Sequence, residues 1–302
     1  MNKTTDFDLN SSFLGKKSET PEIYDASLLF RIPRTENRIR YGIKEDELKF
    51  IGADVWNCYE ISFLTNNGCP VSRILKIIYP CESEFLVESK SLKLYLNSFN
   101  MERCGKSIQD AESTVLEMIR KDLGNLLETN VKTVFFNDKS EEQIPFRDLK
   151  FRSLIDLFST YKLELTNFTH FSETPELLKG NLTGKVQHYA FSTDILRSNC
   201  RVTNQPDWGD LFVRISTSYE IDLLSVIAYL ISFRKENHFH EEVVEMIFMR
   251  FLEIFKAEKL MVAAMYTRRG GIDINPIRAS HPELLDEVLL STTSRCAKTL
   301  RQ

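Results

Sequence analysis

The sequence predicts an α+β fold made of two similar halves, with antiparallel sheets and helices packed on one face. Three observations support this prediction. Short segments recur in the same order in both halves, and each half reads as strands, then two helices, then strands. The composition also allows a sizeable core, because 42% of the 302 residues are hydrophobic and 27% are charged, as in ordinary globular domains.

The repeat consists of two pairs of matching segments. Tyr95–Phe99 (YLNSF) is echoed by Tyr229–Phe233 (YLISF), and Glu117–Ile119 (EMI) is echoed by Glu245–Ile247 (EMI). Tyr95–Phe99 and Tyr229–Phe233 are each followed by a long amphipathic segment, and these two segments contain the Glu-Met-Ile match. A six-residue insertion in the first half would keep both pairs aligned. Two matches in the same order are better explained by duplication than by coincidence.

Local patterns then place the elements in order along the chain. Alternating β-branched residues predict strands at Ser72–Tyr79 and Leu211–Ser218. Helical periodicity predicts four helices, and the last of them carries an apolar stripe at Val244, Ile247, Phe251 and Ile254. The predicted helices are Ser89–Phe99, Ser107–Leu127, Leu223–Lys235 and Phe239–Lys256, and further strands are expected at Lys132–Phe136 and Met261–Thr267.

The two halves define the expected domain organisation. Residues 1–140 should form a first module with an extended N-terminal arm, and residues 186–302 should form a second module. The intervening segment 141–185 matches neither copy and is interpreted as a connection.

Charge and hydropathy argue against several classes of protein. The formal net charge is −4 and its signs are well mixed, so no basic face for nucleic acid is expected. The longest apolar run, Leu223–Ile231, is too short to span a membrane. Met1–Lys17 is polar and lacks a signal-peptide core, so the expected location is the cytoplasm.

The six cysteines contain no CxxC pair, so we expect free thiols and no structural zinc site.

Cys200 is the strongest candidate for chemistry. It precedes an expected turn centred on Gln205-Pro206-Asp207, which proline should make rigid. A thiol and a carboxylic acid across such a turn can act as nucleophile and proton donor. From these residues alone, a half-buried cysteine beside a turn aspartate is the simpler interpretation.

Three other segments carry polar side chains in informative patterns. Glu88–Tyr95 (ESKSLKLY) offers a carboxylate for the edge of a nucleobase beside two lysines, although it also fits a solvated helix face. His240 and Glu241 begin a predicted helix, where an acidic residue complements the helix dipole without any further function. Arg268–Gly271 (RRGG) suits a phosphate, but it equally fits a surface turn. No GxGxxG or Walker motif occurs among the 11 glycines.

Together these segments resemble the QueF family, the NADPH-dependent 7-cyano-7-deazaguanine reductases of queuosine biosynthesis. The similarity starts near Leu14–Lys16 and covers almost the whole chain except the stretch near 137–185. The matching segments are Ile32–Arg34, Asn37-Arg38, Glu88–Tyr95, Ser198–Cys200, Asn204–Gly209, Phe239–Glu241 and Tyr266–Pro276.

The resemblance is to the longer, two-module branch of the family. It implies two tunnelling-fold (T-fold) modules per chain, assembled as a homodimer. Neither half carries a complete set of motifs. The first half has Thr65 where an aspartate seven residues after Cys58 would stand, and the second half has Asp222-Leu223-Leu224 in place of the Glu-Ser-Lys run. A site must therefore combine both halves.

The family's reaction implies roles for ten residues. Cys200 would add to the nitrile carbon and form a covalent thioimide, while Asp207 moves a proton to the nitrile nitrogen. Two NADPH per turnover would then reduce the thioimide to the primary amine, without a metal. The resemblance assigns substrate contacts to Val87, Glu88, Ser89, His240 and Glu241, and cofactor contacts to Ser89, Lys90, Arg269 and Gly270.

Two other functions stay open at this point. A T-fold enzyme of the GTP cyclohydrolase kind needs a metal held by cysteine and histidine, and the five histidines do not frame Cys200. A non-catalytic nucleobase-binding module would have no need for Cys200 and Asp207. The roles of the other five cysteines stay open as well, with plain packing favoured.

Overall fold

The computed structural model describes residues 21, 23–137, 143–145, 151–157, 162–163, 166–299 and 301–302. The expected N-terminal arm through residue 20, including Leu14–Lys16, lies outside these residues. So does part of the expected connection 141–185. No helix within the described ranges is both long and apolar enough to cross a membrane.

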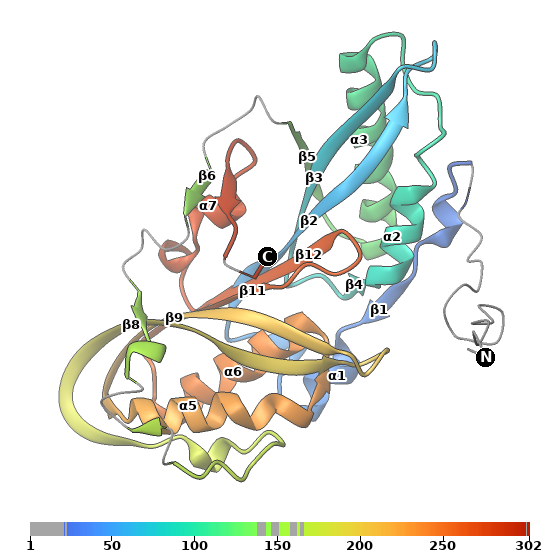
Figure 1. The fold of residues 1–302 in the computed structure, drawn as a ribbon. Coiled ribbons are helices and arrows are strands. Elements are labelled where there is room, and N and C mark those ends of the chain that lie inside the picture. The colour runs from blue at the N-terminus through green and yellow to red at the C-terminus, as the bar shows by residue number, and fades with distance from the viewer. Residues whose placement is uncertain are drawn as a thin grey trace, which may run out of the picture.

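The main sheet runs through the centre of the molecule (Figure 1). Its strand order is β10-β8-β9-β11-β12-β2-β3-β5, with β7 also paired to β8. Neighbouring strands are antiparallel, except that β10 and β7 each run parallel to β8. The strands are β2 (Ile51–Leu64), β3 (Pro70–Pro80), β5 (Lys132–Phe136), β7 (Arg152–Ser153), β8 (Gly180–Cys200), β9 (Pro206–Ile221), β10 (Asn237–His238), β11 (Lys259–Tyr266) and β12 (Ile272–Ala279).

Four longer helices cover one face of this sheet. Helices α2 (Ser89–Asn97) and α3 (Ile108–Leu127) pack on β2 and β3, and α5 (Leu223–Ser232) and α6 (His240–Ile254) pack on β8, β9 and β11. The opposite face carries a smaller apolar cluster that includes Leu289 of α7. The shorter elements are α1 (Thr35–Arg40), α7 (Glu287–Leu290), and two small sheets that pair β1 (Arg31–Pro33) with β4 (Phe85–Val87) and β6 (Gln143–Pro145) with β13 (Arg295–Ala297).

The predicted α+β class, with antiparallel strands and helices on one face, is confirmed. Strand β5 has the predicted bounds, and α2, α3, α5 and α6 lie within the predicted helices. The junction between the halves was not predicted. Strand β12 pairs with β2 over eight residues, so the strands of both halves form one continuous sheet.

Strand β12 escaped prediction because it does not alternate. All eight of its residues are buried, including Asp273, Asn275 and Arg278. A strand that is covered on both faces has no polar side, so the period-two pattern that reveals half-buried strands is missing.

Candidate active site

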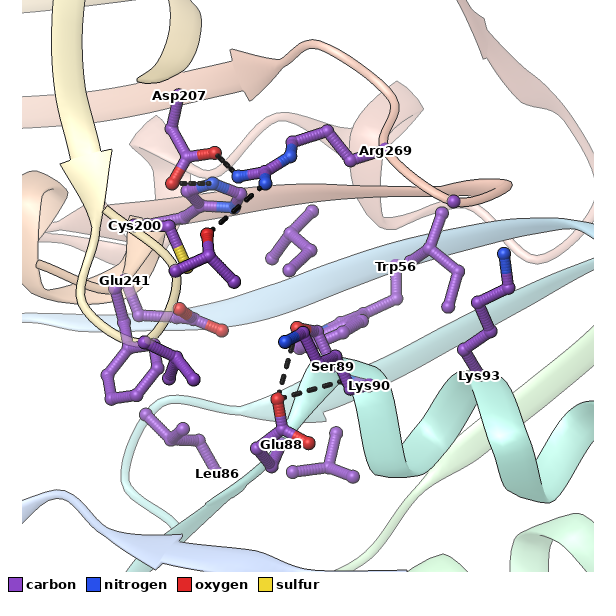
Figure 2. Close-up of a pocket in the computed structure, with 18 of the residues that line it drawn as sticks. Trp56, Leu86, Glu88, Ser89, Lys90, Lys93, Cys200, Asp207, Glu241 and Arg269 are labelled. Carbon is purple, nitrogen blue, oxygen red and sulfur yellow. Dashed lines mark hydrogen bonds and ion pairs between the residues drawn. The ribbon is translucent and has the colours of Figure 1, made fainter. Parts of the chain in front are cut away.

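A cavity of about 330 Å³ opens between the start of α2 and the hairpin that joins β8 to β9. Figure 2 shows Cys200, Asp207 and Arg269 on one side of this cavity, with Glu88 on the other side. Both halves of the chain therefore contribute to one site, as their incomplete motifs predicted. All ten predicted site residues line the cavity: Val87, Glu88, Ser89, Lys90, Cys200, Asp207, His240, Glu241, Arg269 and Gly270.

Cys200 is the last residue of β8 and sits at the base of a tight hairpin. Its backbone N–H donates to the carbonyl of Gln205 at 2.8 Å, and its carbonyl accepts from the N–H of Asn204 at 2.9 Å. Asn204 has φ 57°, in the left-handed region that asparagine tolerates better than most residues. The thiol is half-buried and free, so a ligand in the cavity can reach it.

The predicted position of the turn is wrong. The reversal occupies residues 201–204, whereas Pro206 is the first residue of β9 and Asp207 lies within the strand, opposite Ser198. Proline is tolerated at the first position of a strand, where its missing N–H is not needed. As a result Asp207 is held by sheet hydrogen bonding rather than by a loop.

Both carboxylate oxygens of Asp207 have cationic or imidazole partners. Oδ1 pairs with the Arg269 guanidinium, and Oδ2 lies 3.4 Å from His240 Nε2. Burial works to raise the pKa of Asp207, which is only 3% exposed. The hydrogen bond and charge of His240, followed by those of Arg269, outweigh this effect, so the pKa lies below its ordinary value.

The imidazole of His240 is fixed by stacking. Its ring lies 3.8 Å from the Tyr266 ring at an interplanar angle of 11°. Its Nδ1 is buried and has no hydrogen-bond partner among the described residues. The histidine therefore faces Asp207 with one nitrogen and keeps the other available.

Glu88 is the N-cap of α2. Its Oε1 accepts from the N–H of Lys90 at 3.0 Å, and its Oε2 accepts from the N–H of Ser91 at 2.7 Å. Such a carboxylate satisfies orphan donors of the first helical turn and complements the helix dipole. It is only half-buried, so it also borders the cavity.

Glu241 lies in the first turn of α6 and is almost fully enclosed, with 2% exposure. Its Oε1 has no partner among the described residues. Burial, and then the negative charge of Asp54, raise the pKa of Glu241 to about 8, although Arg34 opposes them. An unpaired buried carboxyl at a cavity wall is a strong acceptor or donor for a polar ligand.

A buried network of ion pairs supports this wall. Asp54 pairs with Arg34 at 2.5 Å and with Arg278 at 2.9 Å. Glu245 pairs with Arg38 and Arg278, each at 2.8 Å. The resemblance had drawn attention to Arg34 and Arg38 without giving them a role.

Two further residues of the cavity were missed by sequence reasoning. Trp56, on β2, has a buried indole Nε1 without a partner in the described part of the chain. His238 pairs in β10 with Cys200 in β8, and its ring nitrogens lie 3.0 Å from Glu236 and 3.2 Å from Glu242. No local signal separates such residues from ordinary core residues. Trp56, His240 and Glu241 all line this cavity, and each carries a buried polar atom without a partner among the described residues.

The cavity also suits a ligand that carries phosphates. Lys90, Lys93 and Arg269 line it, and Gly270 has φ 57°. A Cβ on Gly270 would lie 3.1 Å from Lys93 Nζ, so a side chain there would crowd these cations. Among the described residues, no group of three or more histidine, cysteine, aspartate or glutamate side chains could hold a metal ion.

Comparison with known proteins gives a consistent result. Residues 20–135 match the family model described as "Nitrile reductase, 7-cyano-7-deazaguanine-reductase N-term", and residues 206–284 match "QueF-like protein". The chain is 41% identical over 274 residues to a protein of Polaromonas sp. strain JS666, covering 91% of this chain and 94% of that one. It is 39% identical to a protein of Acidovorax ebreus (91% and 95% coverage) and 36% identical to one of Colwellia psychrerythraea (98% and 97%). All three are named NADPH-dependent 7-cyano-7-deazaguanine reductase.

Proposed function

The chain belongs to the nitrile reductase family of 7-cyano-7-deazaguanine reductases, and we propose that it reduces the nitrile of 7-cyano-7-deazaguanine to a primary amine with NADPH. The resemblance noted in the sequence is thereby confirmed. The product, 7-aminomethyl-7-deazaguanine, places the enzyme in queuosine biosynthesis. The observation that carries the proposal is that Cys200, Asp207 and Glu241 line one cavity, in a chain similar to these reductases over most of its length.

The proposed first step is covalent. The Cys200 sulfur bonds to the nitrile carbon, one π bond of the nitrile is lost, and a thioimide forms. Asp207 accepts the thiol proton and passes it to the nitrogen, where negative charge develops. The pairing of Asp207 with Arg269 and His240 supports this role, because an ionised carboxylate is ready to accept a proton.

Conversion of a nitrile to an amine needs two hydrides, which NADPH supplies when bound, so two cofactor molecules are consumed per turnover. The cations Lys90, Lys93 and Arg269 that line the cavity fit that cofactor. In our proposal Lys90 and Arg269 hold its phosphates, while Ser89 and Gly270 contact it through polar or backbone atoms. Walls that exclude water would protect the imine formed after the first hydride from hydrolysis.

Recognition of the base is assigned to the two glutamates and their neighbours. The guanine-like edge carries a ring N–H and an exocyclic amine, both of which donate to carboxyl oxygens. Glu88 and Glu241 border the cavity from different halves, with His240 beside Glu241 and with Val87 and Ser89 flanking Glu88. We assign substrate contact to these five residues.

We further propose that the two halves, 1–140 and 186–302, are tandem T-fold modules separated by the connection 141–185. Support comes from matched contacts. Ser98 Oγ donates to the carbonyl of Tyr95 at 2.6 Å, and Ser232 Oγ donates to that of Tyr229 at the same distance.

The family resemblance also suggests a homodimer. The cysteines are all free, which fits the reducing cytoplasm.

One assay tests the activity. Purified protein should oxidise two NADPH for each 7-cyano-7-deazaguanine consumed, followed by absorbance, and should yield the aminomethyl product by mass spectrometry. Guanine, which lacks the nitrile, is the matched control and should cause no NADPH loss. An absence of nitrile-dependent oxidation by folded protein would reject the proposed function.

A further inference from the structure

Arg269 does more than line the cavity. It lies in the turn between β11 and β12, and its guanidinium points across the cavity wall to the β8–β9 hairpin (Figure 2). Nη1 pairs with Asp207 Oδ1, while Nη2 donates to Gln205 and lies 3.4 Å from Thr203 Oγ1. The fork of one arginine thus ties the proton acceptor to the turn that follows Cys200.

This arrangement controls the state of Asp207. The carboxylate is buried, and its second oxygen faces His240 Nε2 at 3.4 Å. With one oxygen held by a permanent cation, the carboxylate stays ionised and its orientation is restricted. Without Arg269, only the His240 imidazole would be left to offset the burial of this carboxylate.

We propose that Arg269 is a positioning residue for Asp207 in the covalent step, which needs no cofactor, in addition to its contact with the cofactor. The inference rests on the proposed function. In this step the S–H bond breaks, the S–C bond forms and the nitrile becomes a C=N group. The proton moves from sulfur to Asp207 and then to nitrogen. The step involves no net oxidation or reduction, and Arg269 keeps its charge throughout.

The test is the pH dependence of adduct formation in the absence of NADPH. Intact-protein mass spectrometry would follow the addition of 7-cyano-7-deazaguanine to wild type, Arg269→Gln, Arg269→Lys and Arg268→Gln between pH 5 and 8. An arginine beside an aspartate lowers its pKa by about one to three units. Arg269→Gln should therefore move the acid limb of the rate profile up by about one to three units and slow adduct formation most at pH 5, the acid end of the range.

The other variants separate this role from a merely structural one. Arg269→Lys keeps a positive charge and should restore most of the acid limb. Arg268→Gln is the matched control in the same turn, because its guanidinium lies over the Tyr59 ring at 4.7 Å and should leave the profile unchanged. Asp207→Asn should form adduct slowly at every pH.

A wild-type rate profile for Arg269→Gln would overturn the inference. Contact with the cofactor would then be the only role proposed for Arg269. A profile equally disturbed in Arg269→Lys and Arg269→Gln would also overturn it, because charge would then be irrelevant. No adduct in the wild-type protein is a different failure, since it would reject the proposed covalent step itself.

Discussion

The starts of α2 and α5 are built alike and used differently. In each, an acidic N-cap accepts from two backbone N–H groups of the first turn: Glu88 from Lys90 and Ser91, and Asp222 from Leu224 and Ser225. The N–H of each cap donates to a carbonyl of a preceding segment, Phe30 at 2.9 Å and Lys179 at 3.0 Å. The helices continue alike, with edge-to-face ring pairs at 5.3 Å: Tyr95 with Phe99, and Tyr229 with Phe233.

The difference lies in what surrounds the two caps. Glu88 is followed by Ser89 and Lys90 and borders the cavity that holds Cys200. Asp222 is followed by two leucines and borders a separate cavity of about 220 Å³. The cap itself is therefore a requirement of the helix, and the chemistry depends on neighbours that the fold leaves free to vary.

The shared Glu-Met-Ile segment gives a second contrast. Glu117 of α3 is 60% exposed and pairs with Arg120 one turn along the helix. Glu245 of α6 is 5% exposed and pairs with Arg38 and Arg278 in the buried network. Identical residues in similar helices thus have different energetic roles, because only one helix packs over the junction of the two halves.

The largest expected effect compares the hairpins of the two halves. Cys200→Ala should lower turnover roughly a thousandfold or more and abolish the covalent adduct, because no other group replaces the nucleophile. Cys69→Ala, an exposed cysteine at the β2–β3 hairpin of the first half, should leave both unchanged. NADPH oxidation and intact mass measure these outcomes. An adduct that persists in Cys200→Ala would place the nucleophile elsewhere.

The second prediction concerns the two matching glutamates. Glu245→Gln should lower the free energy of unfolding by about 3 to 5 kcal/mol, because it leaves buried arginines without a charged partner. Glu117→Gln should change it by about 0.5 kcal/mol or less, as expected for an exposed pair. Urea denaturation of both variants measures the difference. Similar losses would show that the buried network does not matter for stability.

A third prediction uses the raised pKa of Glu241, about 8. Between the unfolded value near 4.5 and pH 8, the unfolded chain ionises this group while the folded protein keeps it protonated, so stability falls as pH rises through this window. Glu241→Gln removes this loss. It should gain stability relative to wild type from pH 5 to pH 9, on the order of a few kcal/mol at most.

The matched control is Asp110→Asn in the first turn of α3, where the acidic side chain is exposed. Its unfolding free energy should follow the wild-type pH curve. Denaturation at pH 5, 7 and 9 distinguishes the two variants. A Glu241→Gln curve parallel to wild type would show that Glu241 is ionised in the folded protein.

The smallest expected effect compares the two caps. Glu88→Ala and Asp222→Ala should each cost about 1 kcal/mol of stability, because each leaves helix N–H groups without an acceptor. Only Glu88→Ala should also raise the KM for the nitrile substrate, about tenfold, through loss of a charged hydrogen bond. Thermal unfolding and steady-state kinetics measure the two effects. A raised KM in Asp222→Ala would contradict the assignment of substrate contact to Glu88 and not to Asp222.

Local features of the fold could be predicted well. The four main helices follow from apolar residues at helical spacing, a pattern that depends only on the residues of one segment. The turn after Cys200 could not be placed, because Pro206 fits the first residue of a strand as readily as a turn. Strand β12 was missed because its polar residues are buried on both faces.

The candidate site was predictable only in part. Residue spacing made Cys200 and Asp207 candidates, and the family motifs supplied the other members of the set. The same reasoning did not select Trp56 and gave His238 no role, because a tryptophan in a strand and a histidine before a helix are ordinary core residues.

By itself the sequence determined the family, the α+β class and the need for both halves in one site, because these depend on residue types and short spacings. Only the tertiary structure decided that β12 joins β2, that Arg269 reaches Asp207, and that Glu245 is buried while Glu117 is not. The physical reason is that these properties arise from contacts between distant segments. The burial and the electrostatic environment of these residues depend on neighbours from distant parts of the chain, which no local sequence pattern shows.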